Sequence, residues 1–267
     1  MSYKVYLWAS LSPLEWSQAA WRVEGTTVSA EACEGEFIRD VILEHLPRHG
    51  LVVDAGCGTA KWPIYLRRAG YRCVGLEISA DACRMARELD PGLPLLRSDT
   101  RHIPFRDASV DAVLSLGVVE HDEAGPHEQL REIRRVLRPD GVLILAVPFN
   151  NLFRRLLINR LHDRVTRRRR QANVALGFAE YRFSRHEIER FLRETGFEPI
   201  AAHPNDLRPP KVMGLWVDRS NLVFDPLAGQ PTEPFVLPGL RGQLAAAALR
   251  WVPWLVCGEA TYVARPR

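Results

Sequence analysis

A glycine turn and a distant acid are the residues of this chain best suited to chemistry. The apolar run Val52-Val53 leads into Asp54-Ala55-Gly56-Cys57-Gly58, and Glu77 ends a second apolar run about 20 residues later. Glycines let backbone approach a ligand where a Cβ would clash, and a carboxylate can accept hydrogen bonds from two ribose hydroxyls. A dinucleotide site would use a third glycine to seat a pyrophosphate, but Thr59-Ala60-Lys61 follows Gly58. The pattern therefore predicts a site for a nucleoside without a pyrophosphate.

The elements that position these residues alternate between strands and helices. Near-continuous apolar runs are typical of parallel strands that are buried on both faces. They predict strands over Leu51–Asp54, Arg72–Glu77, Leu93–Arg97, Val110–Leu116 and Val142–Val147, with further strands over Phe197–Ala202 and Ala260–Ala264.

Helical spacing and capping signals fill the gaps between these strands. Apolar residues from Phe37 to Leu46 recur at helical spacing, and a helix near Pro126–Arg138 stops at the turn sequence Arg138-Pro139-Asp140-Gly141. Ser184 and Glu187 fit a capping box that opens a helix ending at Gly196. Residues 1–35, which include Trp8, Trp16 and Trp21, predict one or two short helices before the core.

Four ordered segments resemble class I S-adenosylmethionine (SAM)-dependent methyltransferases, of the small-molecule, type 11-like subfamily. Asp54-Ala55-Gly56-Cys57-Gly58 looks like the first motif of that family, and Gly75-Leu76-Glu77-Ile78-Ser79 looks like its second-strand motif. Ser98–Phe105 resembles its adenine-contacting loop, and Leu130–Leu143 resembles the helix, turn and strand that follow its fourth strand. One glycine motif would be weak, but four at family spacing are a strong signal.

The resemblance implies an α/β, Rossmann-like fold in a single methyltransferase domain over 1–267. Its seven-stranded sheet would have the order 3-2-1-4-5-7-6, with the last strand antiparallel and helices on both faces. Residues 1–35 would form an N-terminal helical segment, and 36–203 with 258–267 the core. The ranges 150–180 and 204–257 would be acceptor-site or lid insertions, because loops at the carboxyl ends of the strands vary with the substrate.

The resemblance also implies the cofactor site. Asp54, Gly56, Cys57 and Gly58 would line the methionine and ribose side of SAM, and Glu77 would bind both ribose hydroxyls. Around the adenine, the resemblance places the side chain of Ile78, the carboxylate of Asp99 and the backbone N–H of Thr100. The backbone at Leu116 would contact the methionine part. No metal site is expected.

His121 is the candidate catalytic residue, because an unperturbed imidazole titrates near neutral pH. In the family this histidine is often positional, so a role in placing neighbouring groups stays open. His102 and Glu120 are further candidates. Trp16, Trp21 and Trp62 would either wall the acceptor pocket or pack the N-terminal helices onto the core.

An arginine-rich stretch, Arg154–Arg170, admits three interpretations. Arginines interleave there with Phe153, Leu156, Leu157, Ile158 and Leu161. They would form the solvated face of a lid helix, contact an anionic or lipid-linked acceptor, or bind nucleic acid. The chain lacks an Asn/Asp-Pro-Pro-Tyr/Phe sequence after the fourth strand and a Pro-Cys after the fifth. Their absence disfavours methylation of a nucleobase amino group and a covalent cytosine mechanism.

The bulk composition is compatible with a soluble α/β enzyme. The 267 residues are 46% hydrophobic and 25% charged, with a formal net charge of +4. The odd number of cysteines, five, without a Cys-x-x-Cys pair favours free thiols in a reducing compartment. With no signal-peptide pattern and no long apolar run, we expect a cytoplasmic protein.

These observations predict methyl transfer from SAM to a small or amphipathic organic acceptor at oxygen or nitrogen, with S-adenosylhomocysteine as the second product. A small-molecule acceptor is the expected partner, without specific nucleic acid, and the oligomeric state is open. Two alternatives remain: an RNA methyltransferase that uses the arginine-rich segment, and a SAM-binding protein without turnover.

Overall fold

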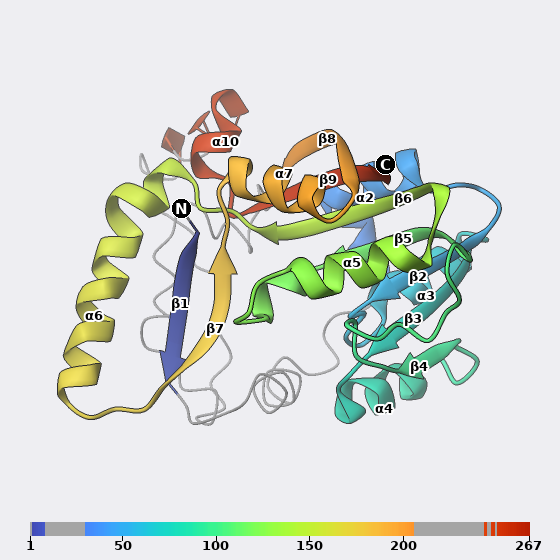
Figure 1. The fold of residues 1–267 in the computed structure, drawn as a ribbon, viewed down its shortest axis with the longest axis horizontal. Coiled ribbons are helices and arrows are strands. Elements are labelled where there is room, and N and C mark those ends of the chain that lie inside the picture. The colour runs from blue at the N-terminus through green and yellow to red at the C-terminus, as the bar shows by residue number, and fades with distance from the viewer. Residues whose placement is uncertain (1, 9–29, 206–242, 245–246, 249) are drawn as a thin grey trace.

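A seven-stranded mixed sheet forms the centre of the molecule (Figure 1). The computed structural model describes residues 2–8, 30–205, 243–244, 247–248 and 250–267. The sheet order is β4-β3-β2-β5-β6-β9-β8, which is 3-2-1-4-5-7-6 when its strands are counted along the chain. β9 runs antiparallel to both β6 and β8, whereas β2 to β6 pair in parallel. The predicted fold class and strand order are confirmed. The strands of this sheet are β2 (Leu51–Ala55), β3 (Arg72–Glu77), β4 (Leu95–Arg97), β5 (Val110–Leu116), β6 (Leu137–Pro148), β8 (Phe197–Asn205) and β9 (Glu259–Pro266).

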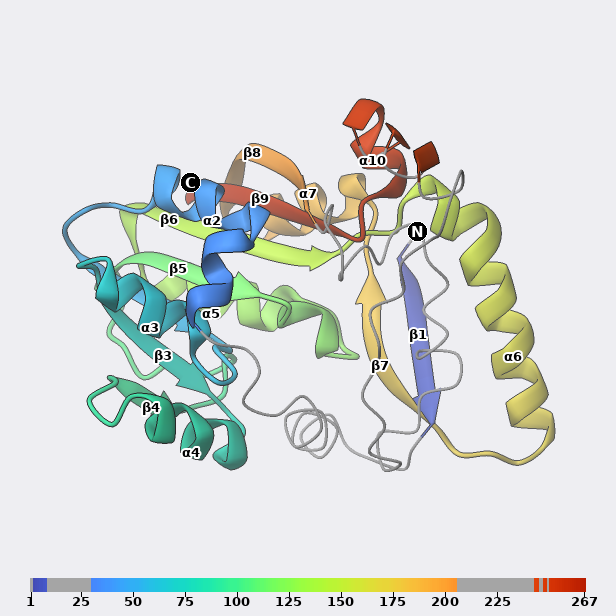
Figure 2. The same ribbon diagram turned by 180° about the vertical axis from the view of Figure 1, so that it is seen from behind.

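Helices cover both faces of the sheet. Helices α5 and α7 lie on one face of the sheet, and α2 and α3 lie on the opposite face (Figure 2). Apolar side chains of α5 and α7 pack into one core cluster with the strands, and those of α2 and α3 pack into another. The smaller helix α4 packs with α3 through Cys83 and Ala86. No helix within the described ranges is long and apolar enough to cross a membrane. The helices of the core are α2 (Phe37–His45), α3 (Lys61–Arg68), α4 (Ala80–Leu89), α5 (His127–Val136), α7 (Arg185–Glu194) and the short α10 (Pro253–Val256), with the 3-10 turns η2 (Ala30–Gly35) and η3 (Val119–His121).

The amino terminus departs from the prediction. Tyr3–Trp8 is a strand, β1, not a helix, and it pairs antiparallel with β7 (Leu176–Arg182) as a separate two-stranded sheet. Four of its six residues are aromatic or β-branched, which suits a strand, but the partner strand lies far along the chain. Residues 9–29, with Trp16 and Trp21, lie outside the described residues, as does most of the predicted 204–257 insertion.

β6 is the second departure. The strand begins at Leu137, so Arg138–Gly141 is not a free turn between helix and strand. Val110 pairs with Leu137 and Ala112 pairs with Val142, and the register shifts between these pairs. The four residues Arg138–Gly141 of β6 therefore stand opposite the single residue Asp111 of β5, and the pairing of the two strands is irregular there.

The helix after Ser184 follows the prediction. Glu187 Oε2 accepts the backbone N–H of Ser184 at 3.1 Å, which is the hydrogen bond from the N-cap backbone to the N3 side chain of a capping box. The helix ends at Glu194, and Gly196 follows with a left-handed φ of +86°. Between β6 and β7 the chain forms a π-helical turn, η4 (Arg154–Ile158), that continues into α6 (Asn159–Gln171) at one end of the molecule.

Candidate functional site

The turn after β2 brings backbone closer to its neighbours than a side chain allows. Gly56 has a φ of +88°, and a Cβ there would lie 2.5 Å from Cγ2 of Val118. The N–H groups of Gly56 and Cys57 both donate to the carbonyl of Leu76, at 2.8 and 2.9 Å. The Cys57 side chain is buried, which raises its thiol pKa well above the usual value. The backbone of this turn is thus held in one conformation, and the Cys57 side chain packs within it.

Glu77 is the acid that this turn holds. Its side chain is 5% exposed at the end of β3. Oε2 accepts the N–H of Gly58 at 2.9 Å, and Oε1 accepts the N–H of Ser79 at 2.8 Å. Burial raises the pKa of Glu77, and the backbone donors partly oppose that rise. Since an ionised carboxylate has about four acceptor positions, two remain for the hydroxyls of a ligand.

Asp54 is a second buried carboxyl beside the same turn. Burial, with a smaller contribution from the charge of Glu77, raises its pKa to about 7, while Lys61 acts in the opposite direction. Lys61 itself forms an ion pair with Glu36. Asp54 therefore changes charge near neutral pH, and a cationic ligand group beside it would favour the ionised form.

The ends of β3 and β4 supply the side of the site predicted for adenine. Ile78 is 37% exposed, unusual for a large apolar side chain next to a buried acid. Asp99 is held by Arg101, whose N–H donates to Oδ1 at 2.9 Å and whose guanidinium approaches Oδ2 at 2.7 Å. This contact lowers the pKa of Asp99 despite an opposing effect of burial, and Thr100 beside it is buried.

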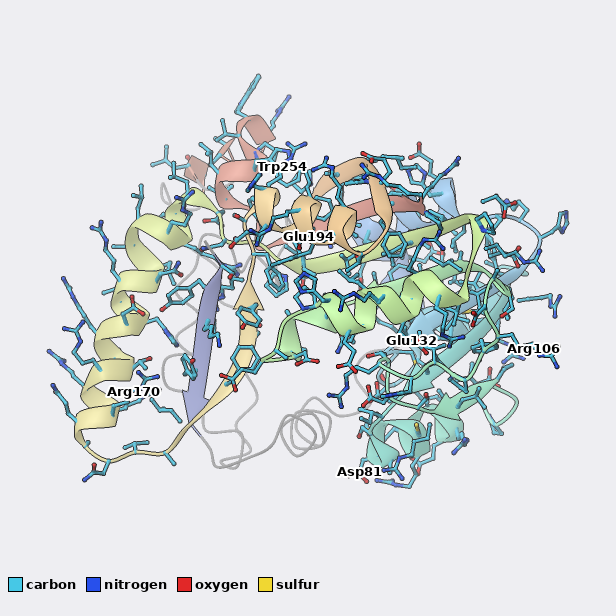
Figure 3. All side chains as sticks on the ribbon, in the orientation of Figure 1. Asp81, Arg106, Glu132, Arg170, Glu194 and Trp254 are labelled. Atoms are coloured by element: carbon cyan, nitrogen blue, oxygen red, sulfur yellow. The ribbon has the colours of Figure 1, made fainter. Side chains whose placement is uncertain are left out.

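The loop that carries Asp99 and Thr100 is fixed from α5. Glu132, labelled in Figure 3, accepts the N–H of Ile103 at 2.7 Å and binds the guanidinium of Arg135 at 2.7 Å. Arg135 in turn donates to the carbonyl of Ile103 at 3.0 Å. These contacts make the loop part of the rigid core. No sequence pattern marks Glu132 or Arg135 as residues that support this loop.

The end of β5 carries the candidate catalytic residue. Leu116 is half-buried and precedes Gly117 and the short turn η3. Nδ1 of His121 lies 2.7 Å from the carbonyl oxygen of Ala179 in β7, so the ring donates a hydrogen bond there. Nε2 lies 3.9 Å from Oε1 of Glu120, too far for a hydrogen bond. This hydrogen bond connects His121 to β7. His102 is exposed on the loop after β4.

Two acids near Glu120, Glu180 and Glu259, were not predicted from the sequence. Glu120 is buried, and burial with the nearby charges of Glu180 and Glu259 raises its pKa well above the usual value. Burial also acts on Glu180, but Arg182 at 3.0 Å and His121 outweigh it and lower the pKa of Glu180. Oε2 of Glu120 has no hydrogen-bond partner within the described ranges. No spacing pattern announces this group, because β5, β7 and β9 bring it together from distant parts of the chain.

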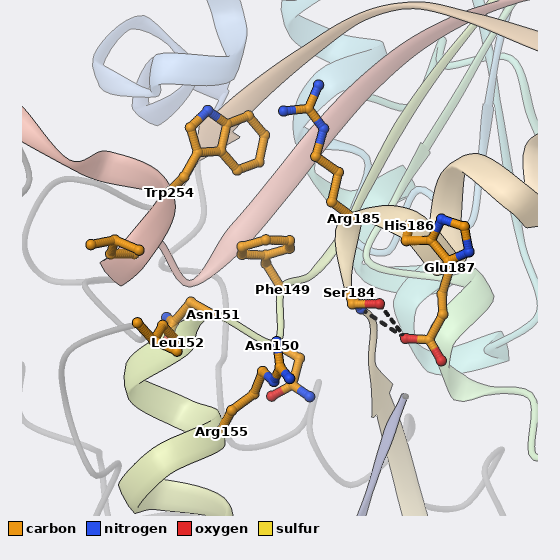
Figure 4. Close-up of a pocket in the computed structure, with 11 residues that line it drawn as sticks. Phe149, Asn150, Asn151, Leu152, Arg155, Ser184, Arg185, His186, Glu187 and Trp254 are labelled. Atoms are coloured by element: carbon orange, nitrogen blue, oxygen red, sulfur yellow. Dashed lines mark hydrogen bonds between the residues drawn. The ribbon is translucent and has the colours of Figure 1, made fainter.

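A pocket of about 500 Å³ lies beyond the end of β6. Figure 4 shows the rings of Phe149 and Trp254 near one another, with centroids 5.4 Å apart, and the guanidinium of Arg185 lies 5.3 Å from the Trp254 ring. β6 stands two strands from β2 in the sheet, roughly 10 Å away at ordinary strand spacing. This pocket is therefore separate from the turn that holds Glu77.

Two expectations about side chains remain. Trp62 is buried in the core, edge-on to Tyr65 at 5.8 Å, so it packs rather than walls a pocket. In the part of the chain that the structure covers, no cluster of three or more histidine, cysteine or acidic side chains could hold a metal ion. All five cysteines are buried free thiols.

The chain resembles known methyltransferases in sequence and in fold. The methyltransferase domain family model matches residues 53–145. A malonyl-(acyl-carrier protein) O-methyltransferase of Pectobacterium atrosepticum is 36% identical over 107 residues, 39% of this chain and 42% of that protein. A tRNA (carboxymethyluridine(34)-5-O)-methyltransferase of Arabidopsis thaliana is 30% identical over 107 residues, 39% of this chain and 26% of that protein. The chain thus spans less than half the length of these curated relatives.

A solved structure extends the fold comparison to most of the chain. The SAM-dependent methyltransferase of Methanosarcina mazei superposes with a TM-score of 0.57 at 17% identity, and covers 85% of this chain and 96% of its own. At that identity the likeness concerns the fold. The two sequence relatives carry different acceptors in their names, so the matched region is common to proteins with different acceptors.

Proposed function

We propose that this chain, which carries a class I SAM-dependent methyltransferase domain, transfers a methyl group from SAM to a small or amphipathic organic acceptor at oxygen or nitrogen. The second product is S-adenosylhomocysteine. The relatives share the methyl-transfer class and differ in the acceptor, so the donor side of the proposal has the broader support.

The observation that carries the proposal is the way Glu77 is held. Two backbone N–H groups, from Gly58 and Ser79, bind its two oxygens at 2.9 and 2.8 Å. The carboxylate is therefore fixed before any ligand arrives, at the strand end where open α/β sheets bind nucleotides. Fixed acceptors lose little conformational entropy on binding, which suits recognition of a ribose diol.

The other residues fit the remaining parts of SAM. The exposed face of Ile78 offers an apolar surface for adenine, and ionised Asp99 can accept from its amino group. Asp54 can balance a positive charge on the methionine part. When bound, SAM supplies a methyl carbon already activated on a sulfonium. The chain then has to orient the acceptor in line with that carbon, exclude water and accept a proton only if the acceptor carries one.

The acceptor side of the proposal rests on the pocket beyond β6. Its walls include Phe149, Trp254 and Leu255. Its charged lining residues are Arg155, Arg185 and Glu187, which leave a net positive charge. β6 is the direct neighbour of β5, so an acceptor with an apolar part in this pocket could extend its polar end toward Gly117 and His121. An amphipathic acceptor with an anionic group suits that lining.

The test is a transfer assay with methyl-labelled SAM and a cell extract that is separated afterwards into solvent-soluble, water-soluble small-molecule and RNA fractions. We expect label in one of the two small-molecule fractions, together with S-adenosylhomocysteine. Label confined to RNA would replace this proposal by the second candidate below. SAM binding without label in any fraction and without S-adenosylhomocysteine would indicate a binding protein.

An RNA acceptor is the second candidate. The tRNA methyltransferase among the relatives and the exposed arginines of α6 favour it. Methyl transfer to tRNA that is lost when Arg167 and Arg168 are replaced by glutamine, with SAM affinity unchanged, would support it.

A further inference from the structure

The charge of this molecule is divided unevenly. The range 150–175 contains eight arginines and one aspartate, a formal net charge of +7, whereas the whole chain carries +4. The rest of the chain is therefore at −3, opposite in sign to this segment. η4 and α6, which hold these arginines, lie at one end of the molecule, and their side chains project outward (Figure 3).

Within the described residues, most exposed arginines of this segment lack an ion pair, whereas many arginines of the core have one. On the core, Arg67 pairs with Asp90, Arg135 with Glu132 and Arg185 with Glu189, each at 2.7 or 2.8 Å. Along η4 and α6, six exposed arginines have no ion-pair partner in the described part of the chain: Arg155, Arg160, Arg164, Arg167, Arg168 and Arg170. A row of unpaired guanidinium groups on one surface attracts an anionic partner.

Exposed apolar side chains adjoin these arginines. Leu156 is 57% exposed, and Leu152 and Leu157 beside it are also exposed. Trp251, two residues before α10, is 76% exposed, and Leu255 within α10 is exposed as well. Both ribbon views show α10 beside the start of the η4–α6 helix, and Leu152, Arg155 and Leu255 line the same pocket. We call this combined surface, η4, α6 and residues 251–255, the basic-apolar surface.

The helix that displays this surface is anchored from behind. Its buried side is polar and includes Asn159, His162 and Thr166. The hydroxyl of Tyr3 donates to Oδ1 of Asp163 at 2.7 Å and lies 2.8 Å from Nδ1 of His162, while Nε2 of His162 lies 3.2 Å from the carbonyl of Tyr6. Strand β1 therefore holds α6 in place, so the exposed face is presented without a folding step.

We propose that the basic-apolar surface docks the protein on an anionic lipid bilayer. Interfacial helices bury leucine and tryptophan at the boundary of headgroups and acyl chains while their arginines contact lipid phosphates. An RNA partner would also satisfy the arginines and could stack its bases on Trp251, but it would leave the aliphatic side chains of Leu156 and Leu157 without a favourable contact. The joint exposure of both residue types favours the bilayer. The inference does not depend on methyl transfer.

The test is co-sedimentation of the full chain with vesicles. We expect binding to phosphatidylcholine vesicles that contain about a third phosphatidylglycerol, weak binding to pure phosphatidylcholine, and loss of binding as salt rises. Arg164→Gln with Arg168→Gln should weaken binding roughly 25-fold, about fivefold for each arginine. Leu156→Glu should weaken it by about tenfold or more, because it puts a charge at the apolar boundary.

Matched control variants lie on the far side of the molecule. Leu89 in α4 is 42% exposed, and Arg106 is exposed at the end opposite α6 in Figure 3. Leu89→Glu and Arg106→Gln should leave vesicle binding unchanged, and circular dichroism checks that every variant folds. No binding to anionic vesicles, or equal binding to neutral ones, would overturn the proposal. Single-stranded RNA binding that falls in the arginine variant but not in Leu156→Glu, without vesicle binding, would assign the surface to RNA.

Discussion

The end of the sheet around Glu77 and the end of the molecule around α6 are built in different ways. Around Glu77, backbone groups hold the functional side chain, and the contacts join neighbouring elements of one βαβ unit. Around α6, side chains hold the element, and Tyr3 reaches a helix about 160 residues away. The first region tolerates few side chains at its turn, whereas the second displays long, exposed side chains. We infer that the first fixes one ligand shape and that the second contacts a broad surface.

The largest effect should come from Gly56→Ala, which strains the Glu77 region. The left-handed φ and the 2.5 Å approach to Val118 should together cost about 2–4 kcal/mol of unfolding free energy. Gly70→Ala is the matched control, since Gly70 also has a φ of +88° but nothing within 4 Å of its Cβ. Urea denaturation should therefore show a smaller loss for Gly70→Ala. Equal losses in the two variants would mean that the contact with Val118 adds nothing.

The next effect concerns the ligand and not the fold. Glu77→Ala should weaken SAM binding by about 1–3 kcal/mol, the scale of lost hydrogen bonds to a charged, buried group. Glu77→Gln, which keeps an acceptor oxygen, should weaken it less. Calorimetry measures both, with the exposed Glu88→Ala in α4 as the control. A folded Glu77→Ala protein with unchanged SAM affinity would contradict the assigned ribose contact.

These two regions also differ in how far the sequence predicted them. The parallel strands and the capping box at Ser184 follow from local signals: apolar runs, glycine turns and a serine three residues before a glutamate. The order of the strands follows from the family resemblance. The segments at the molecule's other end do not. Val5 lies in a strand only because β7 is available to pair with it, and nothing between residues 9 and 175 marks that pairing. Propensity alone cannot identify a partner strand at that separation.

The residues of the candidate site show the same contrast between local sequence signals and long-range packing. Asp54, Gly56 and Glu77 were found because their spacing along the chain reflects one βαβ unit. Glu180 and Glu259 were not found, because only the folded sheet brings them near Glu120. Their effect on the pKa of Glu120 depends on burial and on neighbouring charge, and neither property can be read from the residue type. The roles of the cofactor-site residues and of His121 stay predictions.

A pH titration would sharpen the account of the Glu77 region. The pKa of Asp54 is raised to about 7, so below that pH SAM binding must displace a proton. Affinity should rise with pH and level off above 7, by at most about tenfold per pH unit below it. For the free protein the sign is opposite: the folded state binds more protons than the unfolded chain between about pH 4 and 7, so this carboxyl lowers stability as pH rises through that window.

Calorimetry in buffers of different ionisation enthalpy measures the released proton directly. Asp54→Asn should remove the pH dependence and the proton release together. An Asp54→Asn protein with the same pH profile as the parent would assign the titration to another group, with Glu77 as the first to examine.

A smaller effect should separate the two regions. Tyr3→Phe removes the hydroxyl that binds Asp163, and should cost about 0.5–1.5 kcal/mol of unfolding free energy with faster amide exchange along α6. SAM affinity should not change. Tyr65→Phe is the control, because among the described residues the Tyr65 hydroxyl binds only the exposed Glu34. A fall in SAM affinity in Tyr3→Phe would show that the two regions are coupled and not independent.

The smallest effect is expected at His121, where the two regions meet. Its Nδ1 donates to Ala179 at 2.7 Å and so joins the end of β5 to β7, a positional role. His121→Asn can keep a donor near that position, so its kcat should stay within about threefold of the parent, whereas a general base would contribute about 10²–10⁴-fold. His121→Ala breaks the tie, and should raise the KM of the acceptor more than it lowers kcat. A loss of 10²-fold or more in kcat for both variants, with SAM affinity intact and the pH profile flattened, would make His121 the catalytic base. The β5–β7 junction would then belong to the chemistry and not to the scaffold.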